Sequence, residues 1–384
     1  MYQILTLNNI SPCGLELLTD RYTCGESQPA PDGILVRSAA MHDMELAPSV
    51  KAIARAGVGV NNIPVEACAE KGIVVFNTPG ANANAVKELT IAGLLLSSRK
   101  IADGIRWAAS LDGQPDLTKQ VEKGKSQFVG PEIYGKTLGV IGLGAIGIQV
   151  ANTAVSLGMD VYGYDPYVSV DAAWRLSRAI HRAQDIKDIF ANCDYITIHV
   201  PYMPATKHMI NAEAFQAMKQ GVRLVNFARG ELVDNAAALE ALKTGKLASY
   251  VLDFPVQELI GVPGVTALPH LGASTPESED NCARMAVSQM MDFLENGNIH
   301  NSVNYPDVSL ARSGGERFGI CHKNIHGMLT QITNVFAKEK INIENMTNKS
   351  RGEFAYTLID CLSLSEHIVG ALQEIDGVIR VLHF

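Results

Sequence analysis

The chain reads Val140-Ile141-Gly142-Leu143-Gly144-Ala145-Ile146-Gly147 where an apolar strand meets a helix, and this stretch decides the fold. A Gly-x-Gly-x-x-Gly motif between a strand and a helix predicts a site for the pyrophosphate of a dinucleotide. Gly142 would permit the tight turn, Gly144 would let a phosphate approach the backbone, and Gly147 would allow close packing of the helix. Amides at the start of the helix can then bind the phosphates.

The next apolar strand ends at Asp165, at the usual spacing of about 20 residues for a ribose-binding acid. Its carboxylate would accept hydrogen bonds from the adenosine ribose and would repel a 2′-phosphate. The sequence therefore predicts NAD as the cofactor in preference to NADP. The alternative is a glycine turn followed by an incidental surface aspartate.

Outward from this motif, the sequence predicts an α/β protein with three parts. Six short strands with helical spacers follow one another between residues 138 and 268, which fits one doubly wound domain. An earlier βαβ series covers residues 1–96, and a helix over residues 277–296 would pack back against it. Residues 301–315 contain proline, serine and glycine and indicate a linker. The last segment has the βαββαβ order of a ferredoxin-like domain, with a strand at 341–343 and a helix at 366–374.

Composition excludes several classes of function. The formal net charge is -8 and charged residues make up 19%, so no basic field for nucleic acid or membrane is present. The seven cysteines are scattered without metal-ligand spacing, which indicates reduced thiols and no metal. We find no signal segment or membrane-spanning run and expect a cytoplasmic protein.

Three later strand ends each carry one reactive side chain, namely Arg229, Glu258 and His270. Because carboxyl ends of parallel strands line one crevice, all three could converge beside a nicotinamide. His270 would take a hydroxyl proton near neutral pH, and Glu258 would hold the imidazole and stabilise its protonated form. Arg229 would bind a substrate carboxylate and polarise a keto oxygen. Taken singly, each residue could equally be an ordinary surface side chain.

These motifs together resemble the D-isomer-specific 2-hydroxyacid dehydrogenases over residues 1–304. The resemblance implies a Rossmann-type NAD domain (98–274) inserted in a flavodoxin-like substrate domain (1–97 and 275–305), followed by a regulatory domain (316–384). It also implies the catalytic roles just given and backbone amides that bind the substrate carboxylate. Positions that match cofactor contacts are Gly142, Gly144, Ala145, Ile146, Gly147, Asp165, His199, Val200, Pro201, Thr206, Phe227, Ala228, Arg229, Asp253, His270, Gly272 and Ala273. Positions that match substrate contacts are Arg37, Ser38, Val58, Gly59, Arg229 and His270.

The C-terminal segment is similar to an ACT domain. Family members with one such domain act on a phosphorylated 2-hydroxy acid and bind serine between paired ACT domains, which also implies a homodimer or homotetramer. His322, Asn324 and Asn342 match the serine contacts. The loop after Arg37 and Ser38 carries Ala40 and Met41 where the family commonly has threonine and lysine, so it offers the phosphate fewer partners.

Three alternatives remain open from the sequence. A hydroxypyruvate or glyoxylate reductase would share the two N-terminal domains. An NAD-sensing corepressor or scaffold would share the fold without turnover. A regulatory amino-acid sensor would bind serine and lack dehydrogenase activity, and an ACT domain that only dimerises would bind no serine.

Overall fold

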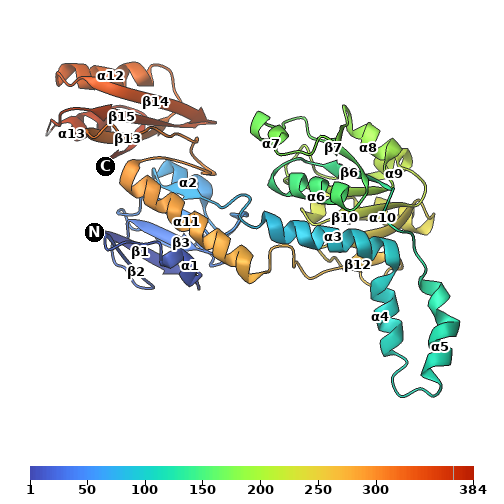
Figure 1. The fold of residues 1–384 in the computed structure, drawn as a ribbon. Coiled ribbons are helices and arrows are strands. Elements are labelled where there is room, and N and C mark those ends of the chain that lie inside the picture. The colour runs from blue at the N-terminus through green and yellow to red at the C-terminus, as the bar shows by residue number, and fades with distance from the viewer. Residues whose placement is uncertain (366) are drawn as a thin grey trace. The chain divides into compact units, whose positions relative to one another are not determined.

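The computed structural model describes residues 1–365 and 367–384, and these form two compact units (Figure 1). Unit 1 contains Met1–Asn82 and Pro276–Phe384, and unit 2 contains Ala83–Thr275. The chain therefore crosses between the units twice, first at 82/83, which is earlier than the domain boundary expected after residue 97. The assignment of substrate, cofactor and regulatory domains stays a prediction.

Unit 2 is built on a seven-stranded parallel sheet with the order β12-β11-β10-β9-β6-β7-β8. This is the doubly wound order, and its reversal lies between β6 and β9, where such sheets bind ligands. The six predicted strands are present, and short β8 at the edge was not predicted. The strands are β6 (Thr137–Ile141), β7 (Asp160–Tyr164), β8 (His181–Arg182), β9 (Tyr195–Ile198), β10 (Val222–Asn226), β11 (Leu247–Leu252) and β12 (Val265–Ala267).

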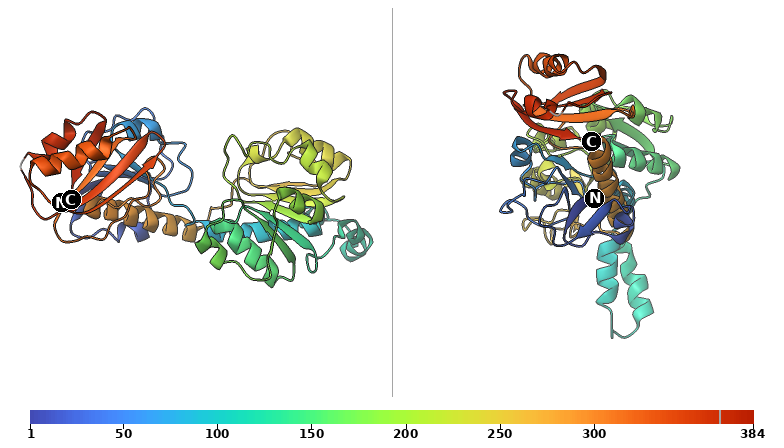
Figure 2. Two further views of the ribbon diagram at one scale, coloured as in Figure 1. Left: turned by 90° about the horizontal axis from the view of Figure 1, so that it is seen from above. Right: turned by 90° about the vertical axis from the view of Figure 1, so that its left-hand side faces the viewer.

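Helices cover both faces of this sheet, each over its own apolar cluster. Helices α3 and α6 pack on one face, and α8, α9 and α10 contribute to the cluster on the other. Helices α4 and α5 form a hairpin that extends away from the sheet (Figure 2). The helices are α3 (Ala83–Arg99), α4 (Ile101–Ala109), α5 (Leu117–Gly124), η1 (Lys125–Phe128), α6 (Ala145–Ser156), α7 (Val170–Trp174), α8 (Ile186–Asn192), α9 (Ala212–Ala217), η2 (Gly230–Leu232) and α10 (Asn235–Lys243).

Unit 1 contains a five-stranded parallel sheet with the flavodoxin-like order β2-β1-β3-β4-β5. Its buried strands are nearly continuous apolar runs, as expected for a parallel sheet covered on both faces. The elements are β1 (Tyr2–Leu7), α1 (Pro12–Leu15), β2 (Tyr22–Gly25), β3 (Gly33–Val36), β4 (Ala52–Arg55), α2 (Val65–Glu70), β5 (Val74–Phe76) and α11 (Pro276–Asn296).

The C-terminal segment of unit 1 forms a four-stranded antiparallel sheet with the order β14-β15-β13-β16. The ferredoxin-like order of elements is confirmed, but the short strand predicted at 341–343 is wrong, because the strand runs from Ile343 to Arg351. The predicted helix at 366–374 includes Glu366, which lies outside the described residues. The elements are β13 (Glu316–Lys323), α12 (Met328–Lys338), β14 (Ile343–Arg351), β15 (Phe354–Cys361), α13 (Ile368–Gln373) and β16 (Val378–His383).

The two sheets of unit 1 share one hydrophobic core. Phe76 of β5, Phe293 of α11 and Tyr356 of β15 belong to the same buried cluster, and the Phe293 ring packs against both aromatic neighbours. The expected linker is wrong as a description of this segment, because Tyr305 is fully buried and donates its hydroxyl to the Ala69 carbonyl at 2.7 Å. The connection from α11 to β13 is therefore packed structure as far as Val308, whereas residues 311–314 are exposed.

A buried ion pair fixes the start of the antiparallel sheet. Arg317 of β13 is fully buried, and its guanidinium meets both carboxylate oxygens of Asp360 on β15, at 2.5 and 2.7 Å. The remaining donors of Arg317 reach the carbonyls of Asn296, Leu310 and Ala311. Because every donor direction is used, this side chain joins α11, the connecting segment and the sheet.

We expect Asp360→Asn to lower the free energy of unfolding by roughly 3–5 kcal/mol, because it leaves the Arg317 charge buried without its partner. Urea unfolding followed by circular dichroism measures the loss. Glu240→Gln is the control, since it breaks an exposed pair with Lys243 and should change stability by less than about 1 kcal/mol. Equal effects of the two substitutions would contradict the structural role of Arg317.

Candidate active site

The glycine loop after β6 has the geometry that a phosphate site needs. Gly142 has a φ of 94°, and a Cβ there would lie 2.7 Å from the His199 carbonyl oxygen. A Cβ at Gly147 would collide with the Gly142 carbonyl, whereas one at Gly144 would meet no atom within 4 Å. Gly144 is thus the N-cap of α6 beside open space, and no side chain caps the helix. Free first-turn amides beside that space suit a pyrophosphate.

Asp165, at the end of β7, is tied to this loop. Its Oδ2 accepts the Leu143 amide at 2.8 Å and its Oδ1 accepts the Tyr167 amide at 2.8 Å. Each carboxylate oxygen retains a lone pair for a ribose hydroxyl. The residues present therefore fit NAD.

The segment after β9 contributes a neutral histidine. The His199 Nε2 lies 3.0 Å from the Thr197 hydroxyl, and desolvation lowers the pKa of His199 to about 3. Further along, the Thr206 hydroxyl donates to the Pro201 carbonyl at 2.8 Å and closes this loop. His199 therefore lies beside the glycine turn and carries no positive charge near neutral pH.

Arg229 follows β10 in a turn that the buried Asn226 holds. The Asn226 Nδ2 donates to the Arg229 carbonyl at 2.8 Å, and its Oδ1 accepts the Ala228 amide at 3.1 Å. Among the described residues, the Arg229 guanidinium makes one hydrogen bond, which its Nη1 donates to the Ala228 carbonyl at 2.6 Å. Sequence reasoning missed Asn226, because its role depends on being buried beside the turn.

The loop that carries His270 is held by a buried carboxylate. Asp253, directly after β11, accepts the amides of Leu271 and Gly272, each at 2.7 Å. His270 lies between β12 and Leu271. Its backbone has a left-handed φ of 57°, which is uncommon for a residue other than glycine. Such a conformation persists only where the surroundings enforce it, and it is enriched at functional sites.

Phe254 is a second residue of this region that sequence reasoning missed. Its ring lies 4.7 Å from the His270 ring, centroid to centroid, at 53°. A Cβ at Gly230, next to Arg229, would lie 3.4 Å from the Phe254 Cβ. Phe254 therefore lies between the loops of Arg229 and His270, and only its place directly after Asp253 could have indicated it.

Arg229, Glu258 and His270 follow three neighbouring parallel strands, β10, β11 and β12, and so leave the sheet at one edge. Within the described residues, Glu258 is exposed and its carboxylate makes no hydrogen bond or ion pair, and the His270 ring makes no hydrogen bond. Hydrogen bonds between catalytic side chains often form only when the substrate is bound. The catalytic assignment stays a prediction.

The predicted substrate residues of unit 1 lie at the carboxyl ends of β3 and β4. Arg37 follows β3, and the Val58-Gly59 turn is held by the Asn77 Nδ2, which donates to the Val58 carbonyl at 2.7 Å. The Ser38 amide donates to the Asn8 Oδ1 at 3.1 Å. Nearby in sequence, the fully buried Thr78 hydroxyl has no partner in the described chain. These assignments, too, stay predictions.

The three predicted effector residues have different surroundings. His322 is buried, with its Nε2 2.9 Å from the Thr357 hydroxyl and its Nδ1 2.8 Å from the Lys323 carbonyl. Asn324 donates to the Gly352 carbonyl at 3.1 Å, and Asn342 is exposed. Local hydrogen bonds therefore hold His322 and Asn324, and the role of all three residues in serine binding stays a prediction.

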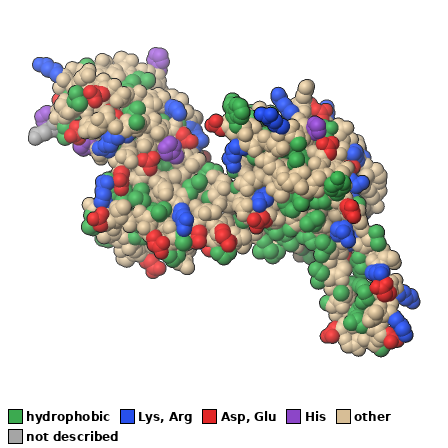
Figure 3. Space-filling view, in the orientation of Figure 1, with side chains coloured by type: hydrophobic (Ala, Val, Ile, Leu, Met, Phe, Trp, Pro, Cys, Tyr) green, Lys and Arg blue, Asp and Glu red, His purple; other side chains and the backbone are tan. Residues whose placement is uncertain are grey.

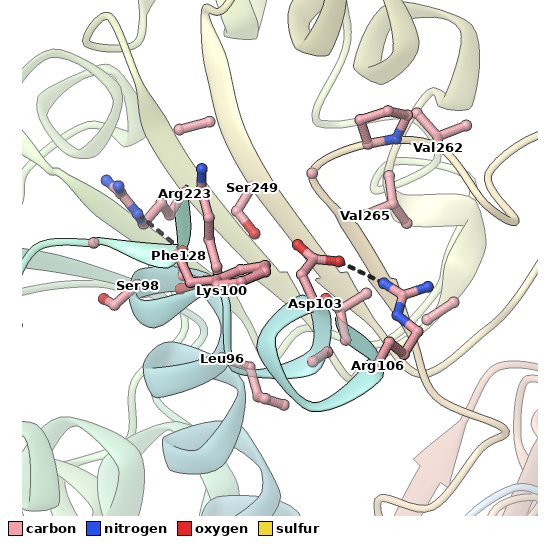
Figure 4. A pocket seen from close by; sticks show the side chains of 18 of the residues that line it. Leu96, Ser98, Lys100, Asp103, Arg106, Phe128, Arg223, Ser249, Val262 and Val265 are labelled. Carbon is pink, nitrogen blue, oxygen red and sulfur yellow. Dashed lines mark hydrogen bonds and ion pairs between the residues drawn. The ribbon is translucent and has the colours of Figure 1, made fainter. Parts of the chain in front are cut away.

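A hollow of about 850 Å³ lies elsewhere in unit 2, at the amino ends of β10 and β11 (Figure 4). Arg223, Lys100 and Ser249 line it together with apolar residues around β12, such as Val262 and Val265. Because the predicted catalytic side chains follow the opposite, carboxyl ends of the same strands, this hollow is separate from them.

The described residues contain neither a metal-binding cluster nor a membrane-spanning helix. No three histidine, cysteine, aspartate or glutamate side chains are grouped so that they could hold a metal ion. No described helix has both the length and the apolar character needed to cross a bilayer.

Comparison with known proteins found related sequences and folds. The family described as "D-isomer specific 2-hydroxyacid dehydrogenase, NAD binding domain" matches residues 92–272. A D-3-phosphoglycerate dehydrogenase of Haemophilus influenzae is 33% identical over 88% of this chain and 82% of that protein. One of Methanocaldococcus jannaschii is 40% identical over 71% of this chain, and the match spans about half, 51%, of that relative.

Two solved structures are also similar. Apo D-mandelate dehydrogenase of Rhodotorula graminis has a TM-score of 0.67 and 25% identity, covering 81% of this chain and 99% of that one. NAD+-bound 3-phosphoglycerate dehydrogenase of Entamoeba histolytica has a TM-score of 0.61 and 26% identity, covering 79% and 98%.

His199 should make stability depend on pH. Its pKa is lowered to about 3 in the folded chain, against about 6.5 when unfolded, so below pH 6.5 the unfolded state binds a proton that the folded state does not. Stability should therefore fall with decreasing pH by up to about 1.4 kcal/mol per unit from this residue. Urea unfolding of wild type and His199→Gln at pH 7.5 and 4.5 measures this, and the variant should lose less stability. Parallel losses in the two proteins would contradict the neutral assignment.

Proposed function

The chain belongs to the D-isomer-specific 2-hydroxyacid dehydrogenase family, and we propose that it is a D-3-phosphoglycerate dehydrogenase. It would oxidise 3-phospho-D-glycerate with NAD to 3-phosphohydroxypyruvate, the first step of L-serine biosynthesis. The observation that carries this proposal is the common edge of β10, β11 and β12, from which Arg229, Glu258 and His270 all leave. The names of the relatives support the phosphorylated substrate.

The residues divide the chemistry between them. NAD held by the glycine loop and Asp165 would supply the acceptor for the hydride that leaves C2 of the substrate. His270 accepts the proton of the C2 hydroxyl as the C–H bond breaks and the carbonyl forms. Glu258 stabilises the resulting imidazolium, and Arg229 binds the substrate carboxylate through its paired donors. Asp253 takes part through the backbone, because it accepts the amides of Leu271 and Gly272 and so fixes the loop that carries His270.

We expect His270→Asn to lower kcat by about 10²- to 10⁴-fold while NAD binding persists. Asparagine tolerates the left-handed backbone of this position, so the loop should keep its conformation. NADH formation from 3-phosphoglycerate measures turnover, and quenching of protein fluorescence by NADH measures binding. Retained turnover would contradict the catalytic role of His270.

The same assay separates the alternatives. Turnover of glyoxylate or hydroxypyruvate, with none of the phosphorylated pair in either direction, would identify a reductase of this family. NAD binding without turnover of any 2-hydroxy acid would favour a corepressor or scaffold. Inhibition by serine would support the effector role proposed for His322, Asn324 and Asn342. The cytoplasmic location expected from the sequence stays a prediction.

We propose that the protein is a homodimer or homotetramer, and the α4–α5 hairpin supports this. Neither helix contains a buried residue, and Ile105 of α4 and Leu117 of α5 are 64% and 52% exposed. Trp107 and Phe128 pack against each other inside the hairpin, so these outer apolar side chains face solvent. Figure 3 shows hydrophobic side chains along this part of unit 2. Short helices of this kind gain most of their stability from packing, which a second copy would supply.

Ile105→Glu should therefore reduce the molecular mass in solution, measured by light scattering during gel filtration. The charge would be buried without a partner wherever the hairpin packs on another subunit. Lys123→Glu is the control on the same hairpin, because this side chain is exposed and already charged. An unchanged mass for Ile105→Glu would show that the hairpin is not the subunit contact, and another surface, such as the C-terminal sheet, would then have to form it.

A further inference from the structure

Two arginines lie close together at the carboxyl ends of the neighbouring strands β3 and β4 in unit 1. Val36 and Arg55 are partners in the ladder between β3 and β4, so Arg37 and Arg55 leave the sheet side by side. The Arg55 Nε donates to the Arg37 carbonyl at 3.0 Å, and its side chain lies across Gly57. Both guanidinium groups thus belong to the edge that holds the Val58-Gly59 turn, where the proposed function places the substrate.

A carboxylate from a distant part of the sequence already meets Arg37. Glu279, in the first turn of α11, has its Oε1 2.5 Å from the Arg37 Nη2. Both side chains are a little under half exposed, at 43% and 44%, so solvent and ligands can reach the pair. The same turn carries Glu277 and Asp280, and Asp280 accepts the Ser11 hydroxyl at 2.5 Å. Arg37 and Glu279 also line a small cavity with Asn9, Ser11 and Ala283.

The pairing matters because a guanidinium binds carboxylates and phosphates through the same paired donors. A substrate group that binds Arg37 must therefore displace the Glu279 carboxylate or share Arg37 with it. A phosphate dianion has enough charge to compete, whereas a weakly charged or neutral group has not. The acidic first turn of α11 adds repulsion that every incoming anion must overcome.

We infer that Glu279 is a built-in competitor for the substrate, which occupies Arg37 until an anionic group at the far end of the substrate displaces it. The inference rests on the proposed function, because Arg37 matches a substrate contact in the family on which that function is based. It adds a residue that the sequence motifs do not include, since 242 positions separate the two partners. Glu279 acts on binding through Arg37 and takes no part in hydride or proton transfer.

Glu279→Gln tests the inference, because it keeps the shape of the side chain and removes the competing charge. We expect KM for 3-phosphoglycerate to fall by about 2- to 5-fold, the range of an exposed ion pair, with kcat little changed. The ratio of this KM to that of D-glycerate, which lacks the distal anion, should fall with it. A merely structural role of Glu279 would move both KM values together.

Glu277→Gln is the matched control, since it removes the same charge from the same exposed turn without releasing Arg37. It should leave the KM ratio unchanged. Combining Arg37→Ala with Glu279→Gln should abolish the gain of the single Glu279→Gln variant, because no guanidinium remains to be released. A rise in KM for 3-phosphoglycerate in Glu279→Gln, or an equal fall in Glu277→Gln, would overturn the inference.

Binding of inorganic phosphate separates this inference from the proposed function. Calorimetric titration of the full chain should give tighter phosphate binding for Glu279→Gln than for the wild type, and no gain in the Arg37→Ala background. If the wild type does not turn over 3-phosphoglycerate, the proposed function fails while this result still supports the Arg37–Glu279 competition. If turnover is normal but phosphate affinity is equal in the two proteins, the inference fails alone.

Discussion

The buried carboxylate of Asp253 is the contact on which the proposed active site depends. It joins the end of β11 to the loop after β12 by accepting two consecutive amides, those of Leu271 and Gly272. These are charge-assisted bonds in a buried place, where each is worth more than in water. They immediately follow His270, so the backbone of this residue is fixed by a group that leaves its side chain free. A general base needs that combination of a rigid anchor and an accessible ring.

The surroundings of the His270 ring are correspondingly sparse. The Phe254 ring packs against it, and His270 adopts a left-handed backbone conformation in a loop that Asp253 holds. An aromatic contact restricts the imidazole without occupying either nitrogen, so both remain available to a substrate and a carboxylate. The turn of Arg229 is built in the same way, because Asn226 donates to the Arg229 carbonyl while the Arg229 guanidinium donates to the Ala228 carbonyl. In both cases the hydrogen bonds are made to main-chain groups, and they hold the loop that carries the functional side chain.

Sequence reasoning could predict the parts of the site whose residues are adjacent in sequence. The glycine loop and Asp165 depend on a strand, a turn and a helix that are adjacent in sequence, and their order was predicted correctly. Asn226 and Phe254 were not predicted, because each acts through a neighbour that only the sheet brings close. The edge strand β8 is too short to leave a pattern. Glu279 is a surface acid in sequence, and only the packing of α11 on β4 places it beside Arg37.

The C-terminal sheet is packed against the first sheet and α11, although the sequence indicated a linker between them. Alternate residues of its strands face opposite ways, so Phe318 and Ile320 pack under the helices while Cys321 and Tyr356 face the first sheet and α11. A free ferredoxin-like domain would leave that second face exposed to water. Here Arg380 donates to the carbonyls of Pro48 and Val50, and Arg351 donates to those of Ser302 and Tyr305, so polar bonds surround the shared apolar contact. The four-stranded sheet is therefore a packed part of the unit that contains Arg37 and the Val58-Gly59 turn, and a ligand bound to it would act on that unit directly.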